Sequence, residues 1–404
     1  MTERTLKTIS INDLASGMYV HQIAEQSGKV KIKSQGKVTN QAVVDTLRTK
    51  GVKKVVIDES KAFDPAPSSP TTDPDVPSPQ QRASKPEYGS RSVRFEDELT
   101  RAQKLHKQGK SIQKQLLNAV QKGLPFDDKI PREFSHKLVE SIDRNPDALL
   151  CLTKIREKDD YLLEHSLNVA ILLANFGRFI GMDETQVNDL AHAGFLHDIG
   201  KIRIPDRILH KPGKLTDMEM NIMRDHVFYG VQALEEENIP AHLIRTVSEH
   251  HERLDGYGYP NGSRGDEISQ EGRMLAIADM YDALTADRCY KQGMPSQRAL
   301  QILVADSPHK LDKELVLQFI KCMGVYPVGS IVLLSNERLA VVTEQTENAH
   351  KPKIRVFYSA RNNHYLELKD VDLAVTSTMR IEKAVQPGDY NIDVQAFFER
   401  VVNQ

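Results

Sequence analysis

The chain has 404 residues, of which 39% are hydrophobic and 27% are charged, and its formal net charge at pH 7 is −2. This composition predicts an ordinary globular protein of about two or three domains, and the near-neutral charge argues against nucleic acid polymers and anionic membranes as partners. The three widely spaced cysteines, Cys151, Cys289 and Cys322, predict no disulfide framework, and the sequence shows neither a signal-peptide core nor an apolar run long enough to span a bilayer, so we expect a cytoplasmic protein.

Residues 1–63 are predicted to form a small α+β domain. Runs at 18–24, 29–34 and 53–59 have strand character, and residues 40–51 have the pattern of one short helix that ends at Gly51. Residues 64–90 combine many prolines with Ser, Thr and Asp, and they contain no aromatic residue before Tyr88. Such a segment cannot form a packed core, so we expect a disordered linker.

Residues 91–129 are predicted to form a helical connector. Apolar residues recur at helical spacing between Arg94 and Gly123, and Gly109 interrupts their stripe. Two interpretations of this stripe stay open. It packs on its own domain, or it forms a coiled segment that makes a homodimer.

Residues 130–325 alternate amphipathic patterns with short loops and contain no good strand run, which predicts an all-helical domain. Asp183 is a candidate N-cap, Thr216 and Glu219 fit a capping box, and Pro240 begins another helix. Residues 326–404 are predicted to form a β-rich appendage and tail, because strand-like runs separated by polar turns continue to about residue 375. The expected fold class is therefore a multidomain, mainly α protein.

Histidines are concentrated in the predicted helical domain. Eight of the 14 histidines lie between residues 165 and 251, where even scatter would place about three. Three of them lie on apolar stripes of separate helical patterns: His165 with Val169, Leu172 and Phe176; His226 with Met218 and Ile222; His251 with Ile244 and Val247. A single inward histidine is usually a core residue, but several buried imidazoles need shared partners, which a metal cluster supplies.

Two adjacent pairs, His197–Asp198 and His250–His251, indicate two metals rather than one. The Asp198 carboxylate has two oxygens and can bridge two ions, which together would ionise a bridging water into the hydroxide that attacks a phosphodiester. Asp279 interrupts an apolar helical pattern, so we expect it to bind a cation. The alternative for Asp279 is a salt bridge to Arg273 or Arg288.

Cationic and aromatic residues near these pairs are candidates for binding a phosphodiester substrate. Lys201 lies one turn beyond Asp198, and Arg288 and Lys291 follow the helix that carries Asp279. Tyr259, in the Gly-rich string DGYGYP, could stack on a nucleobase. The alternatives are solvated helix-end cations and a turn anchored by a packed tyrosine.

Residues of about 130–325 strongly resemble the HD-GYP domain, a subset of the HD phosphohydrolase superfamily. The strings YLLEHSLNVA, FLHDIGKIRIPDRILHKPGKLTDME, MRDHVFYG, EHHERLDGYGYPNGSRGDEI and MLAIADMYDALTADRCYK carry the resemblance in that order. It implies an all-helical fold and metal-dependent hydrolysis of a cyclic dinucleotide, cyclic di-GMP or 3',3'-cyclic GMP-AMP, to the linear dinucleotide. More weakly, ISINDLASGMYV and GVKKVVID resemble a small domain of no assigned function that often precedes HD-GYP domains.

The resemblance also implies a role for individual residues. The family's metal ligands fall on His165, His197, Asp198, His226, His250, His251 and Asp279, and its substrate contacts fall on Lys201, Tyr259, Arg288 and Lys291. Mixed histidine and carboxylate ligands favour two ions of iron or manganese. Some members add a third metal through a Glu at the position that Tyr161 occupies here, so we expect two ions and no metal contact from Tyr161.

Two other classes of function compete with the phosphodiesterase. One is a signalling interaction module that docks onto cyclase domains through its GYP surface, with hydrolysis secondary. The other is a nucleotide phosphohydrolase of the broader HD superfamily. The complete set of ligands argues against a binding-only module, and the GYP string with its basic pair argues against the general phosphohydrolase.

Overall fold

The computed structural model describes residues 6–15, 18–27, 36–38, 44, 47–49, 51–58, 60, 91–154, 161–286, 293–346, 348–390 and 392. The chain divides into two compact units, Met1–Ala83 and Ser84–Gln404. The predicted linker at 64–90 lies outside the described residues. Within the described part of the chain, every helix is too short or too polar to cross a membrane.

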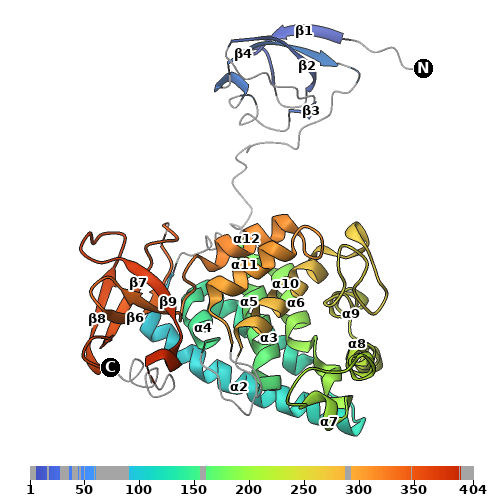
Figure 1. The fold of residues 1–404 in the computed structure, drawn as a ribbon. Coiled ribbons are helices and arrows are strands. Elements are labelled where there is room, and N and C mark those ends of the chain that lie inside the picture. The colour runs from blue at the N-terminus through green and yellow to red at the C-terminus, as the bar shows by residue number, and fades with distance from the viewer. Residues whose placement is uncertain are drawn as a thin grey trace, which may run out of the picture. The chain divides into compact units, whose positions relative to one another are not determined.

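The first unit contains a four-stranded antiparallel sheet with strand order β1-β4-β2-β3 (Figure 1). Its strands are β1 (Leu6–Ser10), β2 (Tyr19–Gln26), β3 (Gly36–Lys37) and β4 (Val52–Asp58). Val20, Val52, Val55 and Ile57 form much of its small core. Strand β1 was not predicted, because its side chains are mostly exposed and only backbone pairing with β4 defines it. The strand expected at 29–34 lies outside the described residues.

The second unit is built on a helical core, as the sequence predicted (Figure 1). Its helices are α2 (Phe95–Lys122), α3 (Lys129–Arg144), α4 (Pro146–Leu152), α5 (Tyr161–Phe179), α6 (Glu184–Leu196), α7 (Asp206–Leu209), α8 (Asp217–Glu236), α9 (Ala241–Ser248), α10 (Gln270–Thr285), α11 (Ser296–Asp306) and α12 (Lys313–Met323), with the 3₁₀ turns η2 (Ile199–Arg203) and η3 (Gly265–Glu267). Asp183 and Thr216 each form a capping box, which fixes where α6 and α8 begin.

Helix α2 packs on its own domain. Its residues Leu99, Ile112 and Leu116 are buried in the same core as the helices that follow. The apolar stripe of α2 therefore fits the first of its two interpretations, packing on its own domain. Gly109 interrupts the stripe because a Cβ there would lie 2.6 Å from the Phe134 ring, so glycine permits close helix packing. The side-chain amide of Gln113, also buried, donates to a backbone carbonyl near the end of α6. Helix α2 thereby supports the segment that leads to His197 and Asp198.

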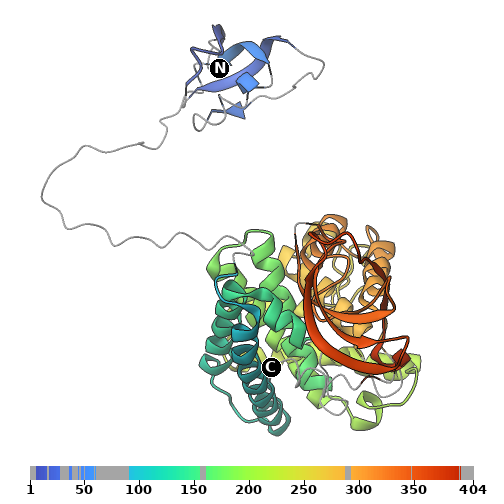
Figure 2. The same cartoon turned by 90° about the vertical axis from the view of Figure 1, so that its left-hand side faces the viewer.

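The chain ends in a five-stranded antiparallel sheet with strand order β8-β7-β6-β5-β9, which lies beside the helical core (Figure 2). Its strands are β5 (Ile331–Leu334), β6 (Arg338–Glu344), β7 (Lys353–Ser359), β8 (His364–Asp372) and β9 (Ile381–Val385), and the 3₁₀ turn η4 (Pro387–Tyr390) follows. Strand β9 was not predicted, because only Val385 among its side chains is buried and the apolar signal is weak. Arg355 forms ion pairs with Asp370 on β8 and Glu96 on α2, which ties the sheet to the helices. The predicted mainly α fold class with a small β-rich C-terminal part is confirmed.

Candidate metal centre

His165 lies in the middle of the helical core on α5. The apolar stripe predicted for it is confirmed, because Val169, Leu172 and Phe176 are all buried. On one side its Nδ1 lies 2.8 Å from an oxygen of Asp282, and on the other its Nε2 lies 3.0 Å from Oδ1 of Asp279; both carboxylates come from α10. Burial favours the neutral imidazole, but the hydrogen bonds to Asp279 and Asp282 outweigh it and raise the pKa of His165 to about 9.

The His197–Asp198 pair lies where α6 gives way to η2. Helix α6 ends at Leu196, His197 is its C-cap and Asp198 precedes the 3₁₀ turn, and the two side chains come within 3.4 Å of each other. Gly200 brings this turn against α8, because a Cβ on Gly200 would overlap the carbonyl oxygen of His226 and the amide nitrogen of Gly230. The glycine thus allows two ligand-bearing segments to come together.

His226, His250 and His251 form a further cluster of candidate ligands. His226 is buried on α8, but the stripe predicted for it was wrong at Met218, which is 78% exposed because that end of α8 reaches solvent. The prediction that a helix carries His251 was also wrong. Helix α9 ends at Ser248, and His250 and His251 lie in the turn that follows. This turn buries His250 fully and leaves the side chain of His251 24% exposed.

Three of these imidazoles are oriented by the backbone. In each, Nδ1 lies within hydrogen-bond distance of the carbonyl oxygen three residues earlier: His197 with Gly194 at 2.8 Å, His226 with Met223 at 2.7 Å, and His250 with Val247 at 2.5 Å. A carbonyl can only accept, so Nδ1 carries the proton and Nε2 of the neutral ring presents a lone pair to the site.

Burial favours the neutral form of His226, His250 and His251. Burial, followed by the positive charge of Lys201, lowers the pKa of His226 to about 4. Burial and the neighbouring histidines hold the pKa of His250 well below its usual range, and burial lowers that of His251 to about 3. The Nε2 atoms of His226 and His250 lie only 3.3 Å apart, so two lone pairs face each other.

The seven predicted ligands form two groups around Asp198, and a third set of His197, Asp198 and His250 joins the two. His165, His197 and Asp279 offer ligand atoms within 4.8 Å of one another, and so do His226, His250 and His251. Oδ2 of Asp198 faces the first group, 3.3 Å from Nε2 of His165 and 3.4 Å from Nε2 of His197. Oδ1 of the same carboxylate faces the second group, 3.6 Å from Nε2 of His226 and 3.8 Å from Nε2 of His250.

This donor set fits divalent cations. Nε2 of His197 and Oδ1 of Asp198 are buried without a hydrogen-bond partner, which is costly unless a cation binds them. Burial raises the pKa of a carboxyl, yet His197 and Lys201 outweigh it at Asp198 and keep its pKa well below the usual range. Asp279 likewise stays ionised, because hydrogen bonding to His165 outweighs burial and lowers its pKa. Ionised carboxylates and neutral imidazoles bind iron, manganese or zinc, so a cation at Nε2 of His165 would replace the proton that its raised pKa holds in the metal-free site.

The predicted phosphate-binding residues are only partly described. The ammonium of Lys201 forms an ion pair with Oδ2 of Asp198 and therefore lies at the centre of the site. Arg288 and Lys291 lie outside the described residues, as does the side chain of Tyr161. Among the described residues, Arg273 pairs with Asp312 and Asp266, so a salt bridge from Arg273 to Asp279 is wrong, whereas the Arg288 alternative lies outside the described residues.

Tyr259 lies against the second group of histidines. Its ring centroid is 4.6 Å from that of His251, and burial raises its pKa. The loop is held by the buried Glu252 carboxylate, which accepts hydrogen bonds from the backbone amides of residues 261–263. Gly258 is needed because a Cβ there would lie 2.5 Å from the Cα of Glu252. The loop thus places the tyrosine ring beside the metal ligands.

Three residues near the site were not predicted: Asp282 beside His165, Glu252 in the Tyr259 loop, and Arg224, whose guanidinium carbon lies 5.3 Å from the centroid of the Tyr259 ring. Asp282 had a signal, since it follows Asp279 by three residues and so shares its helix face. Glu252 and Arg224 carried no periodic signal, because their partners lie in an irregular loop.

We expect Asp282→Ala to weaken metal binding about 10- to 100-fold, because Asp282 fixes the ring of His165 and favours the tautomer whose Nε2 faces the site. Metal titration of the metal-free variant would measure this loss. Asp266→Ala is the matched control, since the Asp266 side chain is fully exposed. An unchanged affinity in Asp282→Ala would contradict this role.

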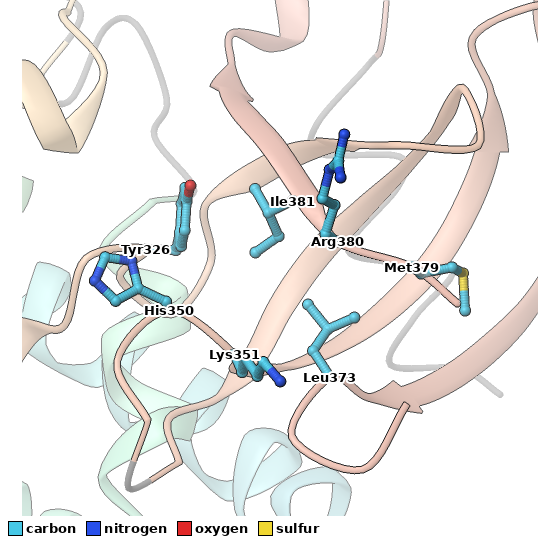
Figure 3. A pocket seen from close by; sticks show the side chains of 7 residues that line it. All are labelled: Tyr326, His350, Lys351, Leu373, Met379, Arg380 and Ile381. Carbon is cyan, nitrogen blue, oxygen red and sulfur yellow. The ribbon is translucent and has the colours of Figure 1, made fainter. Parts of the chain in front are cut away.

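Away from the metal centre, a cavity of about 250 Å³ lies beside the C-terminal sheet (Figure 3). It is lined by Tyr326, His350, Lys351, Leu373, Met379, Arg380 and Ile381. The lining contains one histidine and no carboxylate, so it lacks the ligands for a pair of metals.

Family models match three successive parts of the chain. A domain of unknown function, DUF3391, matches residues 6–129, the HD domain matches residues 150–315, and a KOW domain associated with HD domains matches residues 331–392. The first match includes helix α2, which packs in the second unit.

Curated relatives match the chain over different lengths. Cyclic di-GMP phosphodiesterase PA4108 of Pseudomonas aeruginosa is 33% identical over 380 residues, which are 91% of this chain and 89% of the relative. 3'3'-cGAMP-specific phosphodiesterase 2 of Vibrio cholerae is 40% identical over 156 residues, which are 38% of this chain and 30% of the relative. The cyclic di-GMP phosphodiesterase of Thermotoga maritima is 34% identical over 209 residues, which are 51% of this chain and 56% of the relative. Together with the two ligand groups around Asp198, these similarities show that the chain belongs to the HD-GYP family of cyclic-dinucleotide phosphodiesterases.

Proposed function

We propose that the chain hydrolyses a cyclic dinucleotide, in the first place cyclic di-GMP, to the linear dinucleotide. The observation that carries this proposal is the Asp198 carboxylate, whose two oxygens face two adjoining groups of candidate ligands. The relative that matches over nearly the whole chain is named for cyclic di-GMP, whereas the relative named for 3'3'-cGAMP matches a shorter part. 3',3'-cyclic GMP-AMP is therefore the second substrate to test.

We assign the seven ligand candidates to two metal positions. His165, His197 and Asp279 would hold one ion, His226, His250 and His251 would hold the other, and Asp198 would bind both. Two divalent cations, of iron or manganese, would polarise the scissile phosphate and make water nucleophilic at neutral pH.

The protein's own residues orient and protect this chemistry. Six of the seven ligands are buried, which excludes bulk water and strengthens every charge interaction inside the site. The exposed part of His251 marks the side on which a substrate would enter. Lys201 would place its ammonium where negative charge develops on the phosphate oxygens, while Asp198 holds that ammonium in position.

The test is to incubate the purified protein, loaded with manganese or iron, with each cyclic dinucleotide and to identify the products by mass. We expect a linear dinucleotide, heavier than the substrate by one water, and no product after the metal is removed with a chelator. Further cleavage would appear as mononucleotides. A protein that binds two ions and converts neither substrate would contradict the proposal.

A further inference from the structure

Arg224 lies at the open side of the metal centre, two residues before His226 on α8. Its side chain is exposed, and its guanidinium carbon lies 5.3 Å from the centroid of the Tyr259 ring. The other side-chain contact of Arg224 is a 3.3 Å hydrogen bond to Oδ1 of Asn221. Arg224 is therefore close to the site without being one of its ligands.

The charge of Arg224 is not balanced by any carboxylate in the described part of the chain. Other cations around the site differ in this respect: Lys201 pairs with Asp198, Lys211 with Glu219, and Arg253 with Asp255. An arginine held over an aromatic ring, with its donors still open to solvent, is well suited to bind a phosphate.

Tyr259 explains why the guanidinium is held in this place. The tyrosine ring is tilted by 33° against the ring of His251, and Arg224 lies over the same tyrosine ring. Tyr259 thus contacts both a candidate metal ligand, His251, and a cation, Arg224.

A cyclic dinucleotide carries two phosphodiesters, and hydrolysis to the linear product cleaves only one of them. The other phosphate keeps its negative charge and, because the nucleotide ring is closed, stays at a short fixed distance from the reacting one. We propose that Arg224 binds this second phosphate and that Tyr259 positions Arg224, an inference that rests on the proposed function. Arg224 would then distinguish cyclic dinucleotides from substrates with a single phosphodiester.

The test compares Arg224→Gln with the wild-type protein, both loaded with manganese, on cyclic di-GMP and on bis(p-nitrophenyl) phosphate, which has one phosphodiester. We expect KM for cyclic di-GMP to rise about 10- to 100-fold, the usual effect of losing a hydrogen bond to a charged group, with little change in kcat. Activity on bis(p-nitrophenyl) phosphate and the metal content should stay the same. Arg224→Lys should recover part of the loss, because it keeps the charge but not the planar fork.

Arg361→Gln is the matched control, because it removes the same charge from an exposed turn of the C-terminal sheet. An unchanged KM for cyclic di-GMP in Arg224→Gln, or an equal loss on both substrates, would overturn the inference.

Calorimetric binding of cyclic di-GMP separates this inference from the proposed function. Binding that depends on Arg224 in a protein without turnover would support the role of Arg224 and contradict the proposed function. Turnover that does not depend on Arg224 would support the proposed function and contradict the role of Arg224.

A double-mutant cycle tests the role of Tyr259. We expect Tyr259→Leu to raise KM as Arg224→Gln does, and the double variant to be no worse than either single variant, because both remove the same contact. Tyr259→Phe keeps the ring, so Arg224→Gln should still raise KM in this background by the same factor as in the wild type. Additive losses would contradict the positioning role.

Discussion

Replacing Asp198 by alanine should abolish hydrolysis and leave the fold intact. Asp198 has one oxygen toward each ligand group, so its loss removes a candidate ligand from each proposed metal position. Losing several kcal/mol of transition-state stabilisation corresponds to a fall in kcat of about 10³-fold or more. Steady-state kinetics on cyclic di-GMP and metal analysis of the same sample would measure the two effects.

The stability of Asp198→Ala is measured by thermal unfolding in the presence of a chelator, so that lost metal does not lower the melting temperature of the wild type alone. Asp266→Ala is again the matched control, since it removes a carboxylate from the surface. Wild-type turnover by Asp198→Ala, or by either protein after complete metal removal, would reject the proposed mechanism.

The second large effect is expected for Gly200→Ala. A Cβ at this position would overlap backbone atoms of His226 and Gly230, which cannot move as a flexible side chain does. The turn and α8 would have to separate, which moves Asp198 away from His226. Displacements of about 1 Å cost about 100-fold in rate, and such overpacking costs about 1–3 kcal/mol in the free energy of unfolding.

Gly230→Ala is an unusually close control for Gly200→Ala. The two glycines face each other, but a Cβ on Gly230 would have its nearest neighbour at 3.6 Å, an ordinary contact. Alanine also favours the helix that carries it, so this variant should be as stable as the wild type or slightly more stable. Denaturant unfolding and metal titration compare the pair. Equal behaviour of the two variants would contradict the importance of this close approach.

The site could be predicted largely from the sequence, because its ligands lie in short local motifs. The adjacent pairs His197–Asp198 and His250–His251, and Asp279 within an apolar helix, mark chemistry without knowledge of the fold. The two ligand groups could not be predicted, because they depend on how α5, α8 and α10 pack around the η2 turn. Tertiary structure alone decides which oxygen of Asp198 faces which histidine.

Helical periodicity misled at His251 and Met218, because it shows neither where a helix ends nor which of its turns other elements cover. Helix α9 ends at Ser248, because the chain turns there to place both His250 and His251 near Asp198 and Asp279. Met218 matched the stripe of His226 in spacing, but it lies in the first turn of α8, where no other element covers it. Strands β1 and β9 were missed because exposed edge strands bury few apolar side chains.

The most direct test of the metal centre is anomalous diffraction from crystals of the manganese-loaded protein. We predict two peaks per chain, about 3.5–4 Å apart, one beside each oxygen of Asp198. A single ion, or ions bound away from the seven ligands, would contradict the two-metal centre. A third peak near Tyr161 would contradict the expectation that two ions bind and that Tyr161 makes no metal contact.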